Sequence, residues 1–142
     1  MLGLLVVTHG EVAKELVASV RKIVGNITNL EAVSIDWNDV VDEATRRIEE
    51  ARERVDDGNG VLLLTDMFGG TPTNLALSML EPGKLEIVTG VNLPMLIKFA
   101  NLDEGLSLPD AARELADEAR DSIHVASRLL QSTNQEPQGD ES

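Results

Sequence analysis

Two short apolar runs, each followed at once by polar residues and then by a helical pattern, constrain the fold of this chain most strongly. The first run covers residues 2–7 and leads directly to His9, and the second covers residues 61–64 and leads directly to Asp66. Almost unbroken apolar runs of this length are typical of strands that are buried on both faces of a parallel sheet. Polar side chains at the carboxyl ends of such strands lie where open α/β sheets place their sites.

Strand and helix patterns alternate along the rest of the chain. Further strands are expected at residues 30–35 and 85–89, and helices at residues 11–24, 39–55, 73–80, from about 95 onward, and 108–121. This alternation predicts an α/β fold, with an open, doubly wound, mainly parallel sheet that has helices on both faces.

The length and composition fit one acidic domain. Of the 142 residues, residues 1–130 are expected to form this domain and residues 131–142, which are polar with an acidic end, a disordered tail. The 25 acidic and 12 basic side chains give a net charge of −13, which opposes binding to nucleic acid or to an anionic membrane surface. We see no signal peptide and no apolar run of about 18 residues, so we expect a cytoplasmic protein without membrane insertion. The chain has no cysteine, which excludes disulfides and thiolate chemistry.

The segment at residues 122–130 fits two structures. Ile123 and Val125 alternate with polar residues as in a strand, whereas Leu129 and Leu130 could extend a helix. The residues alone leave both possibilities open.

Three features could carry chemistry, and each also has a structural interpretation. His9 could be a nucleophile or base, or a polar turn residue. Asp66 could orient that histidine, or cap the turn after its strand. Gly69, Gly70 and Thr71, which precede a helix, could bind an anion through backbone N–H groups and a hydroxyl, or form a tight turn.

Considered together, the three features favour phosphoryl transfer. Central strands in such a fold are neighbours, so His9 and Asp66 at equivalent strand ends can come within hydrogen-bonding reach of each other. A carboxylate bonded to one ring nitrogen fixes the tautomer and leaves the other nitrogen free to attack. The chain has no Gly-x-x-x-x-Gly-Lys motif, no Gly-x-Gly-x-x-Gly motif and no cluster of metal ligands. We therefore expect a phosphohistidine reaction without nucleotide, metal or other cofactor.

Three separated motifs carry a specific resemblance. They are Thr-His-Gly at residues 8–10, Asp-Met-Phe-Gly-Gly-Thr-Pro-Thr-Asn at residues 66–74 and Gly-Val-Asn-Leu-Pro-Met-Leu at residues 90–96. In this order and spacing they resemble the mannose-family enzyme IIA domain of the bacterial phosphoenolpyruvate-dependent sugar phosphotransferase system. The resemblance spans about residues 1–130.

The resemblance implies a phosphocarrier role. His9 would take a phosphoryl group on Nε2 from the histidine-containing phosphocarrier protein and pass it to a histidine of a IIB protein, which phosphorylates sugar entering through a membrane permease. Asp66 would hold Nδ1, and Thr71, beside Gly69 and Gly70, would donate to the phosphoryl oxygens. The protein would thus be a phosphotransferase.

The resemblance also implies a homodimer in which a C-terminal strand is exchanged into the partner's sheet, antiparallel to its neighbours. Residues 122–129 are the candidate for this strand, and His124 is expected to have a surface or dimer-contact role. Many family members continue through a linker into a IIB domain, whereas this sequence stops after about a dozen further residues, so the IIB acceptor is expected to be a separate protein or to be absent. Phe68 stands where many relatives have tryptophan, which keeps an aromatic ring at the site.

Two other functions fit some of these features. In the first, the phosphorylation state of His9 is read by a signalling or transcription partner, which the residues neither favour nor exclude. In the second, the chain is the phosphodonor subunit of dihydroxyacetone kinase. We disfavour this because the second motif of that family resembles Asp-Leu-Gly-Ser, unlike the sequence at residues 66–72.

Overall fold

A computed structural model describes residues 1–135 of the chain. The strands are β1 (Gly3–His9), β2 (Leu30–Ile35), β3 (Val61–Thr65) and β4 (Leu85–Thr89). The helices are α1 (Val12–Val24), α2 (Val41–Val55), α3 (Thr71–Leu77), α4 (Leu93–Ala100), α5 (Leu108–Asp121) and α6 (Ala126–Gln135).

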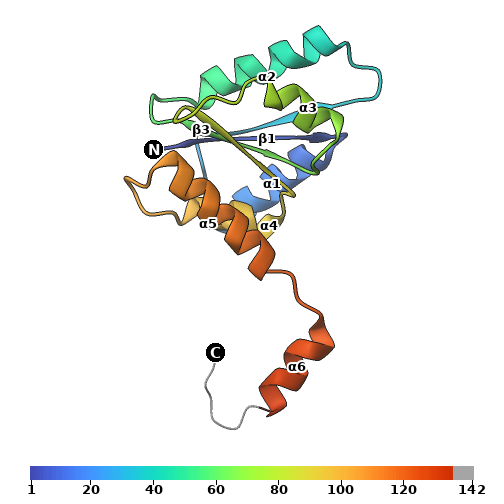
Figure 1. The fold of residues 1–142 in the computed structure, drawn as a ribbon, viewed down its shortest axis with the longest axis vertical. Coiled ribbons are helices and arrows are strands. Elements are labelled where there is room, and N and C mark those ends of the chain that lie inside the picture. The colour runs from blue at the N-terminus through green and yellow to red at the C-terminus, as the bar shows by residue number, and fades with distance from the viewer. Residues whose placement is uncertain (136–142) are drawn as a thin grey trace.

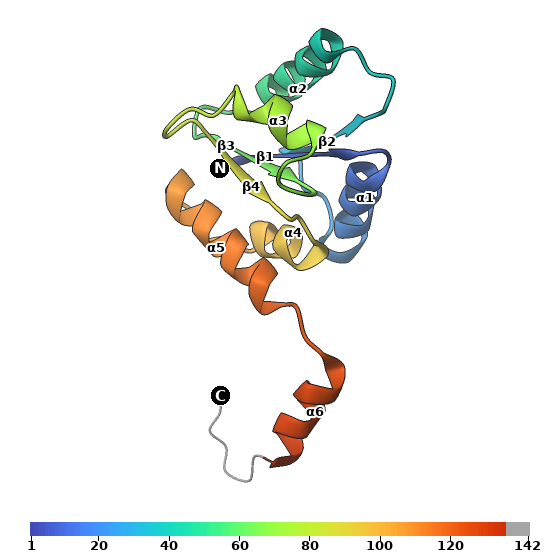
Figure 2. The ribbon, with the colours of Figure 1, turned by 45° about the vertical axis from the view of Figure 1, so that its right-hand side comes forward.

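The four strands form one parallel sheet in the order β2-β1-β3-β4. Helices α2 and α3 cover one face of this sheet, and α1, α4 and α5 cover the other (Figures 1 and 2). The α/β class predicted from the alternating patterns is therefore confirmed, including the helices on both faces.

Both faces of β1 are buried, as its continuous apolar run predicts. Leu4 and Val6 point into the core beneath α1, α4 and α5, whereas Leu5 and Val7 point into the core beneath α2 and α3. All four are fully buried. Because successive side chains of a strand point to opposite faces, His9 lies on the same face as Leu5 and Val7.

The order of the strands places the end of β1 at a topological switch point. The chain leaves β1 through α1 to reach β2 on one side, and then crosses through α2 to β3 on the other side. In sheets of this kind the crevice outside the carboxyl ends of the diverging strands is where ligands bind. His9 ends β1 at this crevice, and Asp66 comes directly after β3.

Two helices start earlier than the sequence pattern predicts. Helix α3 runs over Thr71–Leu77 where residues 73–80 were expected, and α4 begins at Leu93, before Met95. Each helix has a proline in its first turn. Proline is well accommodated there because its missing N–H has no intrahelical partner to lose.

The C-terminal segment differs from its expected structure. No strand forms between residue 122 and Gln135, and α6 is instead a helix that projects away from the body of the molecule (Figure 2). Ile123 and Val125 are 75% and 61% exposed. A strand at this point needs a sheet edge beside it, and the single chain places none there.

Helix α6 overlaps the start of the expected tail. Helix α6 continues to Gln135, where disorder was expected from residue 131. Its first turns contain alanine, arginine, leucine and glutamine, which are strong helix formers. The remainder of the expected tail, residues 136–142, lies outside the described residues.

Candidate active site

The structure brings His9 and Asp66 into direct contact, as their positions after two strands predict. His9 Nδ1 lies 2.8 Å from Asp66 Oδ2, and the backbone N–H of His9 donates to the same oxygen at 3.0 Å. The His9 side chain is 43% exposed, whereas that of Asp66 is only 20% exposed. The carboxylate of Asp66 is thus the more buried of the two groups, and the imidazole of His9 is the more accessible one.

The two hydrogen bonds from His9 keep Asp66 ionised. Partial burial raises the pKa of Asp66, but the hydrogen bonds from the ring and the backbone of His9 lower it more, so the net pKa lies below its usual value. An ionised Asp66 accepts a hydrogen bond from Nδ1–H of His9, and the tautomer that carries its proton on Nδ1 leaves the Nε2 lone pair available. The second oxygen of Asp66, Oδ1, is buried and has no hydrogen-bond partner among the described residues.

Gly70 packs against the edge of the His9 ring that carries Nε2. A Cβ atom at residue 70 would lie 2.7 Å from His9 Cε1 and 3.2 Å from Nε2. A side chain there would push the ring or the loop away. Gly70 also precedes the first residue of α3, Thr71, so the start of this helix lies beside the accessible nitrogen.

Two buried threonines hold the loop between β3 and α3. The hydroxyl of Thr73 lies 2.6 Å from that of Thr65 and donates to the carbonyl oxygen of Met67 at 2.7 Å. Both threonines are at most 1% exposed. This contact ties the first turn of α3 to the end of β3, and thereby fixes Gly70 relative to Asp66.

A surface hollow of about 390 Å³ opens next to His9. Thr71 and Leu75 of α3 line one side of it, and Trp37 and Val41, from the segment that follows β2, line the other. Thr71 of the predicted anion-binding turn therefore shares a cavity with His9, while Gly69, with a φ of +89°, turns the chain just before Gly70. The role of these residues toward an anion stays a prediction.

Trp37 is the lining residue that the sequence interpretation missed. It lies two residues beyond the end of β2, and Ile35 of β2 pairs in register with His9. The rule that pointed to His9 and Asp66, that residues after a strand gather at one edge of the sheet, applies to Trp37 as well.

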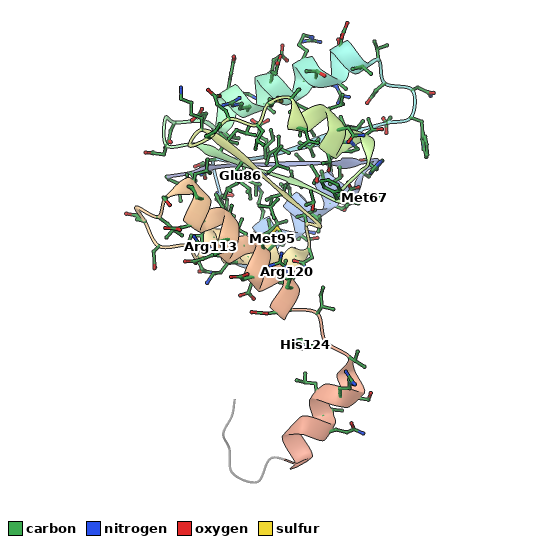
Figure 3. All side chains as sticks on the ribbon, viewed as in Figure 1. Met67, Glu86, Met95, Arg113, Arg120 and His124 are labelled. Atoms are coloured by element: carbon green, nitrogen blue, oxygen red, sulfur yellow. The ribbon has the colours of Figure 1, made fainter. Side chains whose placement is uncertain are left out.

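The two histidines lie in different parts of the molecule. Met67, from the loop beside His9, lies by the carboxyl end of the sheet, whereas His124 lies on the connection between α5 and α6, away from the sheet (Figure 3).

Asn92, from the third motif, caps α4 by accepting from Met95 N and donates to Ala119 O, so it has a structural role.

Two features are absent from residues 1–135. No three side chains of histidine, aspartate or glutamate gather there as metal ligands. No helix in this part of the chain is long and apolar enough to cross a membrane.

Fold and site together define an open α/β domain with a histidine–aspartate pair at its switch point. The family model EIIA-man, described as "PTS system fructose IIA component", matches residues 3–116. The chain therefore belongs to the mannose-type IIA components of the sugar phosphotransferase system, and its role is in sugar phosphotransfer.

Individual relatives agree with this family. The fructose-specific EIIA component of Bacillus subtilis (strain 168) is 31% identical over 145 residues, which cover 99% of both chains. The mannose-specific EIIAB component of Escherichia coli (strain K12) is 30% identical over 103 residues, or 68% of this chain and 30% of that longer protein.

Solved structures share the fold. The PTS IIA protein associated with the fucose utilization operon of Streptococcus pneumoniae has a TM-score of 0.79 at 27% identity, covering 90% of this chain and 95% of that one. The mannose/sorbose-specific IIA subunit from Enterococcus faecalis has a TM-score of 0.73 at 29% identity, covering 87% and 93%.

Proposed function

We propose that His9 accepts a phosphoryl group on Nε2 from the histidine-containing phosphocarrier protein and passes it to a histidine of a IIB component. The IIB component then phosphorylates sugar that enters through a membrane permease. The observation that carries this proposal is the 2.8 Å contact between His9 Nδ1 and Asp66 Oδ2, because it leaves Nε2 as the nucleophile at an accessible place.

The transfer is an exchange of one phosphorus–nitrogen bond for another. The bond in the donor's phosphohistidine breaks as the bond to His9 Nε2 forms, and the electron pair of the broken bond stays on the donor nitrogen. The Nδ1 proton remains on the ring, hydrogen-bonded to Asp66. The carboxylate then stabilises the positive charge that the ring acquires.

The phosphoryl group also brings negative charge close to Asp66. We propose that the turn at Gly69 and Gly70 and the hydroxyl of Thr71 offset this repulsion through their donors, since the first N–H groups of a helix have no intrahelical partner. The proximity of Gly70 to Nε2 supports this arrangement. No metal or nucleotide takes part in the proposed reaction.

Phosphorylation in a reconstituted system tests the site. The purified protein is mixed with phosphoenolpyruvate, enzyme I and the phosphocarrier protein, and the phosphorylated residue is located by mass spectrometry. We expect one acid-labile phosphoryl group on His9, none on His9→Ala and a normal amount on His124→Ala. Normal phosphorylation of His9→Ala would refute the assignment.

We further propose that the protein acts in the cytoplasm as a homodimer held by its C-terminal segment. Ile123, Val125 and Leu130 are at least 61% exposed on an arm that leaves the body of the molecule. Exposed apolar side chains on a projecting element favour association with a second copy.

A further inference from the structure

We propose that Asn59 is a site of spontaneous covalent modification, at which the backbone nitrogen of Gly60 attacks the side-chain amide and converts the asparagine to aspartate and isoaspartate. The site lies in the loop between α2 and β3, at the opposite end of β3 from Asp66. The inference is independent of the proposed function, because the reaction needs neither a phosphoryl donor nor His9.

The loop contains two consecutive pairs of residues that end in glycine. Asp57 precedes Gly58 and Asn59 precedes Gly60, and no other aspartate or asparagine of the chain precedes a glycine. Glycine has no Cβ atom to hinder the approach of its nitrogen to the preceding side chain, and its backbone rotates with little restriction. Either pair could therefore close into a cyclic imide, and the structure distinguishes between them.

The nitrogen of Gly60 is the freer of the two nucleophiles. The N–H of Gly58 donates to Asp56 Oδ1 at 2.8 Å, whereas the N–H of Gly60 donates to no acceptor within residues 1–135. Ring closure requires the attacking nitrogen to turn toward the side chain and to give up its proton. Gly58 must first break a hydrogen bond to do so, and Gly60 need not.

The side chain of Asp57 is also the poorer electrophile. The hydrogen bond from the side chain of Asn59 holds the pKa of Asp57 below its usual value, so this carboxyl group stays ionised at neutral pH. An ionised carboxylate resists attack by a nitrogen, whereas the amide of Asn59 is neutral and can release ammonia. Nucleophile and electrophile therefore both favour reaction at Asn59 and Gly60.

The proposed reaction passes through a succinimide. The bond between Gly60 nitrogen and Asn59 Cγ forms, the bond between Cγ and Nδ2 breaks, and the proton of the Gly60 N–H leaves with Nδ2 as ammonia. Water then opens the ring at either carbonyl carbon. Opening at Cγ gives aspartate, and opening at the backbone carbonyl gives isoaspartate, in which the chain runs through the side chain.

Exposure of the loop favours this reaction, and one contact restrains it. Asn59 and residues 56–58 are exposed, so water and base reach the amide. Asp57 Oδ1 accepts from the side-chain nitrogen of Asn59 at 2.9 Å and from its backbone nitrogen at 3.3 Å. These bonds hold the amide toward residue 57 and away from Gly60, so the carboxylate of Asp57 slows the ring closure.

The modification changes the entry of the chain into β3. Gly60 is buried, its carbonyl oxygen accepts from Gly3 at 2.9 Å, and the N–H of Val61 donates to Lys84 at 2.9 Å. A Cβ atom on Gly60 would lie 3.4 Å from Leu108 Cδ2, so the backbone has little room to move there. Because isoaspartate adds a backbone carbon directly before this point, we expect the modified protein to be less stable.

Ageing of the purified protein tests the site. The protein is incubated at mildly alkaline pH and digested, deamidation is located by mass spectrometry, and isoaspartate is measured by enzymatic methylation. We expect conversion of Asn59, whereas Asn26, which is also exposed but precedes Ile27, should keep its amide. Equal conversion of the two asparagines, or no conversion of Asn59, would overturn the inference.

Two variants test the geometry of the loop. Asn59→Gln keeps an amide but must close a larger ring, so it should stay unmodified. Asp57→Ala removes the restraint and should raise the rate of conversion of Asn59 by about fivefold or more, the effect of losing one hydrogen bond. Conversion of Asn59→Gln at the parental rate, or an unchanged rate in Asp57→Ala, would contradict the proposed geometry. The melting temperatures of both fresh variants should match that of the parent.

The effect on the fold is measured on the aged parent protein. Its modified fraction carries an additional negative charge and is separated by ion exchange. We expect this fraction to melt at a lower temperature than fresh protein and Asn59→Gln, treated in the same way, to keep its melting temperature. Equal melting temperatures of the modified and fresh parent would overturn the expected effect on β3.

Discussion

Asp66 uses a single carboxylate oxygen, Oδ2, to hold both the ring and the backbone of His9. Replacing Asp66 by asparagine keeps the size but removes the charge, and it can turn an amide N–H₂ toward the donors of His9. We expect Asp66→Asn to fold normally while phosphorylation of His9 slows by about 100-fold or more, the usual effect of losing one preorganised electrostatic contact. Quenched-flow transfer assays would measure the rate.

A matched carboxylate elsewhere provides the control for this variant. Asp103 is exposed and lines a different surface hollow, with Met1 and Leu2. Asp103→Asn should transfer at the parental rate. A rate for Asp66→Asn within about twofold of the parent, far from the ~100-fold scale, would reduce Asp66 to a turn residue.

The lowered pKa of Asp66 also predicts how stability depends on pH. Burial raises this pKa and the hydrogen bonds from His9 lower it more, so the folded-state pKa lies below the unfolded value of about 3.9. A group of this kind stabilises the fold above its unfolded pKa, and the contribution disappears as pH falls through the folded pKa.

The expected result is a pH-dependent difference between the parent and Asp66→Asn. Urea denaturation should show the parent's free energy of unfolding falling more steeply than that of the variant between about pH 5 and about pH 2. Parallel curves over this range would show that the carboxylate has the same pKa in the folded and unfolded protein.

At the scale of structural elements, the loop between β3 and α3 depends on the hydroxyl of Thr73. Thr73→Val keeps the shape of the side chain but leaves Thr65 Oγ1 and Met67 O without this partner. The expected cost is about 1–3 kcal/mol in the free energy of unfolding. Slower transfer should accompany it, because the position of Gly70 is relaxed. Thr73→Ser retains the hydroxyl and should behave like the parent, and equal stability of the two variants in urea would contradict the assigned contact.

The elements that the sequence predicted best are those with an unambiguous apolar pattern. The strands at residues 30–35 and 85–89 and the helix at residues 108–121 have the predicted bounds. The start of α3 was missed by two residues because its first turn packs through Pro72, which the helical pattern does not register. The segment after residue 121 had two compatible patterns, and local sequence cannot decide between a helix and a strand that needs a distant edge.

The contact between His9 and Asp66 was predictable from the sequence, whereas the threonines that hold the neighbouring loop were not. His9 and Asp66 follow apolar strands, so a shared edge of the sheet was the natural expectation. Apolar runs reveal that two strands are buried, but not that β1 and β3 are direct neighbours, which decides whether the side chains touch. The bond between Thr65 and Thr73 depends on how a helix packs on a strand end, and no sequence spacing expresses that.

At the scale of the whole molecule, the C-terminal arm predicts the state of association. We expect the full chain to be a dimer at micromolar concentration by light scattering. Truncation before Ser122 removes the exposed Ile123 and Val125 together with α6, and should give monomers or aggregates. A monomeric full-length protein at micromolar concentration would rule out the proposed homodimer.

The position of the site between β1 and β3 has a consequence for chains that are still being synthesised or are broken. His9 precedes its partner Asp66 by 57 positions along the chain, and the two meet only when β3 pairs with β1. A nascent or broken chain that ends before β3 therefore contains His9 without the carboxylate of Asp66 that contacts its ring. If His9 is phosphorylated as proposed, a chain that stops before β3 should therefore be a poor phosphoryl acceptor and should not compete with the complete fold for the donor.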